Sequence, residues 1–269
     1  MIINHNLNAM NSHRNLLFNN VQQGKSSEKL SSGYRINRAA DDAAGLSISE
    51  KMRAALKSMN QGMRNAQDGV SLVQAAEGAM NEVSDMLTRM KELATQASNS
   101  TYNTDDHNAM VSEYTSLEQA ISYIASNTEF NGIKVLDGSV TTPLNIQVGG
   151  NLADKVEIDL TTVDISALDV GTIDTVANAQ AALAKIDTSI NTVNTARSTL
   201  GAFQNQLEHV YNNISVNAEN LQAAESRIRD TDMAAEMMKY TKFNILQQAS
   251  TAMLAQANQA PQGVLQLLR

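Results

Sequence analysis

The chain has no cysteine, no tryptophan and only 2 prolines, and 4% of its 269 residues are aromatic. Without cysteine, the sequence excludes disulfides, thiolate metal sites and thiol catalysis. A compact core of this size normally takes much of its volume from aromatic side chains. Here Ala, Leu, Ile, Val and 13 Met supply the apolar volume, and such side chains suit helices packed on helices. The composition therefore favours an elongated helical body over a compact globule.

Positive charge and long apolar runs are also scarce. There are 20 Lys and Arg against 28 Asp and Glu, which gives a formal net charge of −8. A general nucleic-acid binder would need a basic face for phosphates. No run of about 18 apolar residues exists, and the first residues lack the apolar core and cleavage site of a secretory signal. We therefore expect neither nucleic acid nor a membrane among the partners.

Helical periodicity dominates what is present. Apolar residues recur at alternating steps of three and four over 45–98 and again over 176–228, a spacing typical of coiled coils. Each segment predicts one long helix, and because neither can bury its stripe alone, we expect the two to pack on each other. A shorter helix is predicted over 104–128, with Thr104 as N-cap and two aspartates in the first turn.

In the middle of the chain, apolar residues recur every second position instead of at the helical spacing. Apolar and polar residues alternate over 144–148 and over 156–160, on either side of a glycine-rich connection. This pattern predicts a β-hairpin at about 140–162. The predicted fold class is mainly α: an elongated antiparallel helical bundle or coiled coil with one β-hairpin.

The two ends carry weaker helical patterns, over 3–33 and 233–258, and Pro261 is expected to end the second helix. Both are rich in Asn, Gln and Ala, and an apolar tail follows. Apolar ends with little charge on a soluble chain indicate that partners cover them. The residues predicted to take part in such assembly are Leu7, Met10, Leu17, Val21, Met238, Ile245, Ala249, Leu265, Leu267 and Leu268.

Two charged clusters lie at similar distances from the two ends of the chain. They consist of Arg35, Arg38, Asp41 and Asp42, and of Arg227, Arg229, Asp230 and Asp232. If the terminal helices run antiparallel, the clusters meet and form a joint between domains. We expect the arginines of each cluster to face the aspartates of the other, within one chain or across to its neighbour. The predicted domains are a terminal helical domain, formed by 1–42 and 230–269, and a helical rod, 43–229.

No constellation for catalysis, a cofactor or a metal is found. The adjacent carboxylates of Asp41 and Asp42 diverge at a helix entry, and none of the four histidines belongs to an HExxH pattern. The glycines at 149–150 precede no phosphate-binding helix. The sequence predicts that the protein is not an enzyme and has neither cofactor nor metal.

Three stretches carry a family resemblance. They are INHNLNAMNSHRNL near the start, KLSSGYRINRAADDAAGLSISEKMRA around the first cluster, and AESRIRDTDMAAEMMKYTKFNILQQASTAMLAQANQAPQGVLQLL at the end. With the segments between them, they resemble bacterial flagellin over nearly the whole chain outside about 161–180. The chain is similar to a short form that lacks most of the outer variable domain.

The resemblance implies a secreted, extracellular protein that polymerises with itself into the flagellar filament for swimming motility. Residues 1–42 and 230–269 would be the two halves of a filament-core domain. It also implies type III export of the unfolded chain, an export chaperone, and contacts with filament cap and hook-junction proteins. A hook-filament junction protein of the same superfamily is the alternative. A secreted enzyme on this scaffold would need an inserted catalytic segment, which the sequence lacks.

The resemblance further implies recognition by the host's flagellin-sensing Toll-like receptor. The matching positions are Arg89, Leu93, Gln96 and Glu113. The first three are spaced four and three residues apart, which places them on one face of a helix. An ordinary solvated face explains the same spacing, so both interpretations stand.

Overall fold

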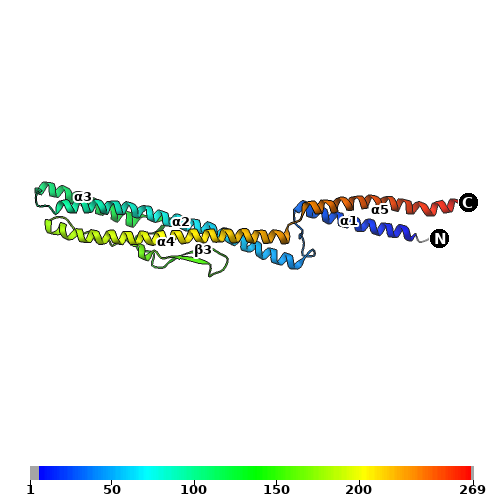
Figure 1. The fold of residues 1–269 in the computed structure, drawn as a ribbon, viewed down its shortest axis with the longest axis horizontal. Coiled ribbons are helices and arrows are strands. Elements are labelled where there is room, and N and C mark those ends of the chain that lie inside the picture. The colour runs from blue at the N-terminus through cyan, green and yellow to red at the C-terminus, as the bar shows by residue number, and fades with distance from the viewer. Residues whose placement is uncertain (1–5, 268–269) are drawn as a thin grey trace. The chain divides into compact units, whose positions relative to one another are not determined.

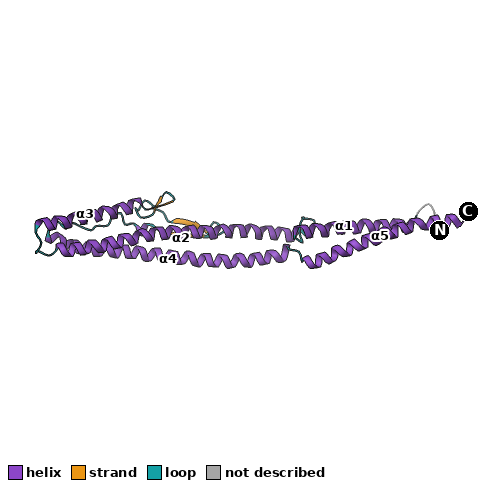
Figure 2. Ribbon diagram, turned by 90° about the horizontal axis from the view of Figure 1, so that it is seen from above, coloured by secondary structure: helices purple, strands orange, loops and turns teal. Residues whose placement is uncertain are grey.

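The computed structural model describes residues 6–267, and it describes the side chains of residues 6–260. Its helices are α1 (Leu7–Ser32), α2 (Ala43–Ala97), α3 (Thr104–Asn127), α4 (Val176–Arg229) and α5 (Met233–Leu267), with a short 3-10 turn η1 (Thr161–Val163). Its strands are β1 (Glu129–Phe130), β2 (Ile133–Lys134), β3 (Leu144–Gln147) and β4 (Lys155–Ile158). The fold is mainly α, as predicted (Figures 1 and 2).

The chain divides into two compact units. The terminal unit comprises Met1–Ala54 and Asn220–Arg269, and the central unit comprises Ala55–Glu219. The two boundaries therefore fall inside α2 and α4, whereas the domains predicted from the sequence change at the breaks between helices. None of the described helices combines the length and the apolar character needed to cross a bilayer.

Helix positions agree closely with the periodicity. The predictions over 45–98, 104–128 and 176–228 are confirmed by α2, α3 and α4. The expected cap of α3 was wrong by one residue: Asn103, not Thr104, is the N-cap, and its side-chain oxygen accepts a hydrogen bond from the Asp106 amide at 2.7 Å. An Asn side chain supplies the same acceptor as a Thr hydroxyl in this position.

Two features of the fold differ from the prediction. The helix expected to end before Pro261 continues as α5 to Leu267. A second hairpin also exists, in which β1 pairs antiparallel with β2. Its two-residue turn is Asn131-Gly132, and both residues have positive φ, 52° and 78°. Asn-Gly favours the turn type that matches the twist of a hairpin, so this dipeptide was the overlooked signal.

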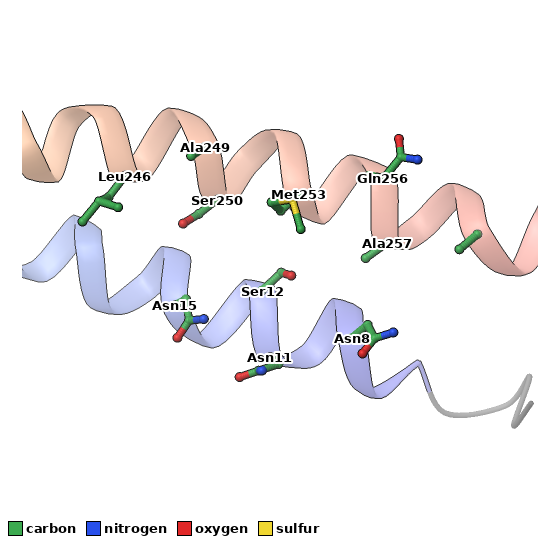
Figure 3. Close-up of a pocket in the computed structure, with 11 residues that line it drawn as sticks. Asn8, Asn11, Ser12, Asn15, Leu246, Ala249, Ser250, Met253, Gln256 and Ala257 are labelled. Carbon is green, nitrogen blue, oxygen red and sulfur yellow. The ribbon is translucent and has the colours of Figure 1, made fainter.

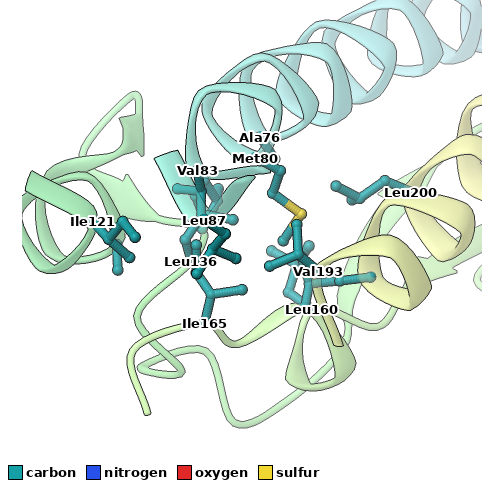
Figure 4. Packing of buried hydrophobic residues seen from close by; sticks show 14 of the residues in the cluster. Ala76, Met80, Val83, Leu87, Ile121, Leu136, Leu160, Ile165, Val193 and Leu200 are labelled. Atoms are coloured by element: carbon teal, nitrogen blue, oxygen red, sulfur yellow. The ribbon is translucent and has the colours of Figure 1, made fainter. Parts of the chain in front are cut away.

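In the central unit, α2 and α4 run antiparallel and share one hydrophobic core, as the two stripes predicted. Lys91 near the end of α2 pairs with Asp187 near the start of α4, at 2.5 Å. Toward the other end of this unit, Gly69 of α2 lies beside Leu207 of α4. Figure 4 shows Met80 and Leu87 of α2 packed among Leu136, Leu160 and Val193.

The β3–β4 hairpin packs closely against α2. Asn65 donates a side-chain hydrogen bond to the carbonyl oxygen of Gln147 at 2.7 Å. One turn earlier, a Cβ atom at Gly62 would overlap the carbonyl group of Val148. Glycine at position 62 therefore permits the hairpin backbone to approach the helix backbone.

A five-residue repeat connects β4 to α4, and it was not predicted. Aspartates recur at positions 159, 164, 169 and 174, each after a buried or partly buried apolar residue. The Asp159 side chain accepts from the Thr161 amide at 2.9 Å, and the Asp164 side chain accepts from the Ser166 amide at 2.8 Å. These local turns direct the apolar neighbours of each aspartate into the core. The buried ones are Ile158, Leu160, Val163, Ile165, Val170 and Ile173.

Candidate assembly surface and joint

Helices α1 and α5 lie side by side and antiparallel in the terminal unit (Figure 3). Polar side chains join the two helices at several points, beside half-buried apolar residues such as Leu16 and Phe243. Asn19 of α1 donates a hydrogen bond to the Ser250 hydroxyl of α5 at 3.0 Å. Ser26 of α1 is hydrogen-bonded to the carboxylate of Glu236, and both side chains are buried.

Polar residues also make up nearly all of the interior of the terminal unit. Among the terminal-unit residues whose side chains are described, the buried side chains are Asn19, Ser26, Ser49, Glu236 and one apolar side chain, Ile36. The central unit buries a continuous apolar cluster instead. The terminal unit therefore does not cover its own apolar side chains.

Those apolar side chains point outward. Seven of the residues predicted to take part in assembly are exposed. Six of them have between 52% and 67% of their surface exposed: Leu7, Met10, Leu17, Val21, Met238 and Ile245. The seventh, Ala249, is also exposed. The backbone of α5 includes Leu265 and Leu267, whose side chains are not among those described, and Leu268 lies outside the described residues. Sequence reasoning missed Phe18, Met237 and Met253, which are also exposed. They add further exposed apolar side chains to both helices.

A groove of about 540 Å³ runs between α1 and α5. Figure 3 shows Asn8, Asn11, Ser12 and Asn15 along α1, with Leu246 and Met253 on the facing helix. The groove therefore combines amide groups with apolar side chains. We call the exposed apolar residues of both helices the assembly surface, and this groove opens onto it.

The two charged clusters meet, as the sequence predicted, but they meet through the backbone. Tyr34 and Asp230 form an antiparallel bridge. The Arg35 amide donates to the Arg229 carbonyl at 2.7 Å, and the Thr231 amide donates to the Gly33 carbonyl at 2.9 Å. Gly33 ends α1 in the left-handed conformation, with φ 74°, which turns the chain toward this bridge.

No ion pair within 4 Å joins the two clusters among the described residues of one chain, and the expected facing of arginines and aspartates, within a chain or across to its neighbour, stays a prediction. Arg38 instead pairs with Glu28 at 2.9 Å. The guanidinium of Arg35 donates to the Ile228 carbonyl at 2.6 Å. Arg227 is exposed and makes no ion pair in the described part of the chain.

Arg229 is the arginine that anchors the joint. Its guanidinium pairs with Glu50 at 2.7 Å and lies 4.8 Å from the centre of the Tyr34 ring. Its side chain is only 12% exposed, whereas that of Glu50 is 44% exposed. Arg229 therefore holds the start of α2, the end of α4 and the turn after α1 together.

The aspartates of the joint are used locally, which explains why they do not cross to the arginines. Asp42 accepts from the Gly45 amide at 2.9 Å, and Asp232 accepts from the Ala235 amide at 3.0 Å, so they cap the starts of α2 and α5. Asp41 accepts from the Arg38 amide at 3.0 Å, and this bond lowers the pKa of its carboxyl group. Asp230 accepts from the Ser226 hydroxyl at 2.7 Å. A short side chain reaches its own turn more readily than a distant guanidinium.

Glu236 is the buried charge of the terminal unit. Burial by itself would raise the pKa of its carboxyl group, but the Ser26 hydroxyl and the ammonium of Lys239 outweigh that effect. Lys239 lies 2.9 Å from the carboxylate. The net result is a lowered pKa, so the side chain is held in its charged form.

The four residues proposed for receptor contact do not share one exposed face. Arg89 is exposed and pairs with Glu113 and with Glu92, each at 2.9 Å. The Gln96 amide donates to the Tyr102 hydroxyl at 3.3 Å. Leu93, in contrast, is 2% exposed and belongs to the core of the central unit. Leu93 therefore belongs to the buried stripe of α2 and does not share the exposed face of Arg89 and Gln96.

No three acidic or histidine side chains converge on a metal-binding geometry within residues 6–260. Of the four histidines, His5 lies outside the described residues. The charged side chains at the joint already bind nearby backbone groups, or, for Arg229 and Arg38, a glutamate side chain. The arrangement provides surfaces for packing rather than groups for chemistry.

Both halves of the chain match models of one family. The bacterial flagellin N-terminal helical region matches residues 3–141, and the bacterial flagellin C-terminal helical region matches residues 183–268. A flagellin of Halalkalibacterium halodurans is 55% identical over 273 residues, and that alignment covers all of both chains. A flagellin of Bacillus subtilis is 45% identical over 304 residues, again with full coverage of both.

Solved structures agree with these matches. The crystal structure of Bacillus cereus flagellin is 34% identical, with a TM-score of 0.52, and the similarity covers 60% of this chain and 94% of that one. A putative flagellar hook-associated protein of Vibrio parahaemolyticus has a TM-score of 0.62 at 15% identity, which shows a shared fold alone. The chain belongs to the bacterial flagellins, a family of structural filament proteins rather than enzymes, and is a short member of it.

Proposed function

We propose that this flagellin polymerises through the assembly surface of α1 and α5, with further copies of the same chain covering it. The observation that carries the proposal is that the terminal unit buries polar side chains and exposes large apolar ones. Its fully buried described side chains are polar apart from Ile36, and most of the large apolar side chains of α1 and α5 are exposed. Burying such side chains against a second copy would contribute about 25 cal/mol per Å² before the entropic cost of association.

A single polar substitution on this surface tests the proposal. Ile245→Gln keeps the length of the side chain but removes an apolar group that is 65% exposed. We expect the critical concentration for polymerisation to rise at least roughly fivefold, since about 1 kcal/mol is lost at each of many repeated contacts. The matched control is Val216→Gln, on an exposed apolar residue of the central unit. Equal effects of the two substitutions would contradict a dominant role of α1 and α5.

Secretion and its partners are also proposals. Apolar surface that stays uncovered in the single chain favours a protein that is kept unfolded or chaperoned until it assembles. An export chaperone bound to the α5 region, type III export and contacts with the cap and hook-junction proteins would satisfy that requirement. Pull-down of the full chain with the cell's own flagellar export chaperone, compared with the chain lacking 233–269, tests the first of these.

Recognition by the flagellin-sensing Toll-like receptor is a further proposal, and it rests on Arg89, Gln96 and Glu113. Arg89 and Glu113 are exposed and pair across α2 and α3, Gln96 is exposed further along α2, and buried Leu93 would act by supporting them. We expect Arg89→Ala to weaken binding to the purified receptor ectodomain, while Arg64→Ala, another exposed arginine of α2, leaves binding unchanged. Unchanged binding by the Arg89 variant would remove Arg89 from the proposed contact.

A hook-filament junction role remains the alternative within the superfamily. The likeness to a hook-associated protein is one of fold alone, and no contact in the described residues favours that role over the filament. Quantifying the chain in sheared filaments separates the two, since a filament subunit is the bulk protein and a junction protein is a trace component.

A further inference from the structure

Pro261 lies inside α5, two turns before the helix ends at Leu267. Proline has no backbone N–H, so it cannot donate to the carbonyl oxygen four residues earlier. That carbonyl belongs to Ala257. A helix that contains proline usually leaves this acceptor to water or to a side chain from elsewhere.

Asn6 supplies the missing donor. Its side-chain amide donates a hydrogen bond to the Ala257 carbonyl oxygen at 2.6 Å, across a sequence separation of 251 residues. The other end of the same amide also has a role. Its oxygen accepts from the Ala9 amide at 3.1 Å and caps the first turn of α1. One side chain therefore begins α1 and completes the backbone hydrogen bonding of α5.

The chemistry of an asparagine fits this double role. An N-cap needs an oxygen acceptor on a short side chain, and the open carbonyl of α5 needs a donor. An aspartate would satisfy the cap but would present a second acceptor to Ala257. An alanine would satisfy neither. The carboxamide provides both groups a fixed distance apart.

The position of this contact matters because few other features fix the register of α1 on α5. The fully buried side chains of the pair are polar (Asn19, Ser26 and Glu236), and its described apolar side chains are exposed or only half-buried. Asn19–Ser250 and Ser26–Glu236 are further polar contacts between the described parts of the two helices. In helix pairs, isolated buried polar groups specify register where apolar packing tolerates sliding.

We propose that Asn6 and Pro261 form a latch that sets the register of α1 against α5, and that this register aligns the assembly surface. Pro261 leaves the Ala257 carbonyl without its helical donor, and Asn6 donates to that carbonyl. The inference rests on the proposed function only for its effect on polymerisation, because the latch itself is a contact within one chain.

A double-mutant cycle on the full-length chain tests the latch. Asn6→Asp keeps the cap of α1 and removes the donor. Pro261→Ala restores a backbone N–H for the Ala257 carbonyl and makes the Asn6 donor unnecessary. We expect Asn6→Asp to raise the critical concentration for polymerisation roughly threefold to tenfold, as for the loss of one hydrogen bond, and to raise it less than twofold in the Pro261→Ala background.

Asn20→Asp is the matched control, because it makes the same change of charge on an exposed residue of α1 that does not line the groove. We expect it to have little effect in either background. Equal effects of Asn6→Asp in the two backgrounds, or no effect in either, would overturn the latch. If the unmutated chain forms no filaments, the proposed function is wrong. The latch is then tested by measuring amide hydrogen exchange of residues 7–12 and 254–260 in the same four proteins. Coupling in that exchange supports the latch, and its absence overturns it.

Discussion

Gly62 shows how one residue positions an element. The hairpin contacts α2 at this point, and the Asn65–Gln147 hydrogen bond holds the two together one turn further on. A methyl group at position 62 would overlap the Val148 carbonyl, which is backbone and cannot rotate away. The hairpin would have to leave the helix or the helix would have to bend.

We therefore expect Gly62→Ala to destabilise the protein by about 1–3 kcal/mol, although alanine is the better helix former. Gly78→Ala is the control, since the space around that helical glycine is open. It should stabilise by about 0.5–1 kcal/mol. Thermal unfolding followed by circular dichroism measures both, and a stabilising Gly62→Ala would mean that the hairpin does not rest on α2 in solution.

Arg229 and Arg227 lie two positions apart in the sequence but have different contacts and different exposure. Arg229 pairs with Glu50 and lies on the Tyr34 ring, whereas Arg227 is exposed and makes no ion pair within the described chain. We expect Arg229→Ala to cost about 1–3 kcal/mol, and Arg227→Ala to stay within about 0.5 kcal/mol of the unmutated protein. Faster hydrogen exchange at the Arg35 and Thr231 amides in the first variant alone would confirm that the joint has opened.

At the scale of the element, the α1–α5 pair contains a pH-dependent contact. Ser26 and Lys239 lower the pKa of Glu236, so the folded pair binds the proton less readily than the unfolded chain does. The resulting stabilisation is complete above the ordinary glutamate pKa of about 4.3 and is lost as the pH falls through the lower, folded value. We expect the helical signal of the terminal helices to fall below about pH 4.3.

Glu236→Gln should flatten this acid dependence while preserving a hydrogen-bonding group next to Ser26. Glu219→Gln, on an exposed position, serves as the control and should leave the acid transition where it is. Circular dichroism of the full chain between about pH 6 and pH 3 makes the comparison. Identical acid transitions in all three proteins would remove Glu236 from the explanation.

The elements differ in how far the sequence revealed them. Long helices such as α2 and α4 repeat one spacing many times, so their extents were predicted to within two residues. The β1–β2 hairpin has two residues in each strand, too few for any period to show. Pro261 misled the prediction because the donor that satisfies the open carbonyl comes from Asn6, at the other end of the chain. A contact of that kind cannot be seen in a local pattern.

At the scale of the whole molecule, the two units take different amounts of stability from their own chain. The central unit buries an apolar cluster supplied by α2, α3, α4 and the connector, while the terminal unit buries mainly polar groups. We therefore expect a chain without residues 233–269 to keep the central unit folded and to lose polymerisation. Unfolding by circular dichroism and electron microscopy of salted-out protein make the two measurements. Filaments of the truncated chain would contradict the proposal.

The candidate site was partly visible in the sequence at this scale. The assembly residues could be named because a stripe without a partner is a local feature, and those described are exposed. The meeting of residues 33–35 with 229–231 followed from the antiparallel arrangement of the ends. The partners of each charge could not be predicted, since Asp42 and Asp232 had nearer amides to cap and Arg229 reached Glu50.

The outward-facing apolar side chains of α1 and α5 have a thermal consequence. Burial of apolar surface is driven by entropy near room temperature and carries a negative change in heat capacity. Polymerisation through Leu17, Val21 and Ile245 should then strengthen on warming from near freezing to room temperature, and heat should be absorbed as filaments grow in the cold. Isothermal calorimetry at several temperatures reads that sign directly. Filaments should therefore be less stable near freezing than at room temperature.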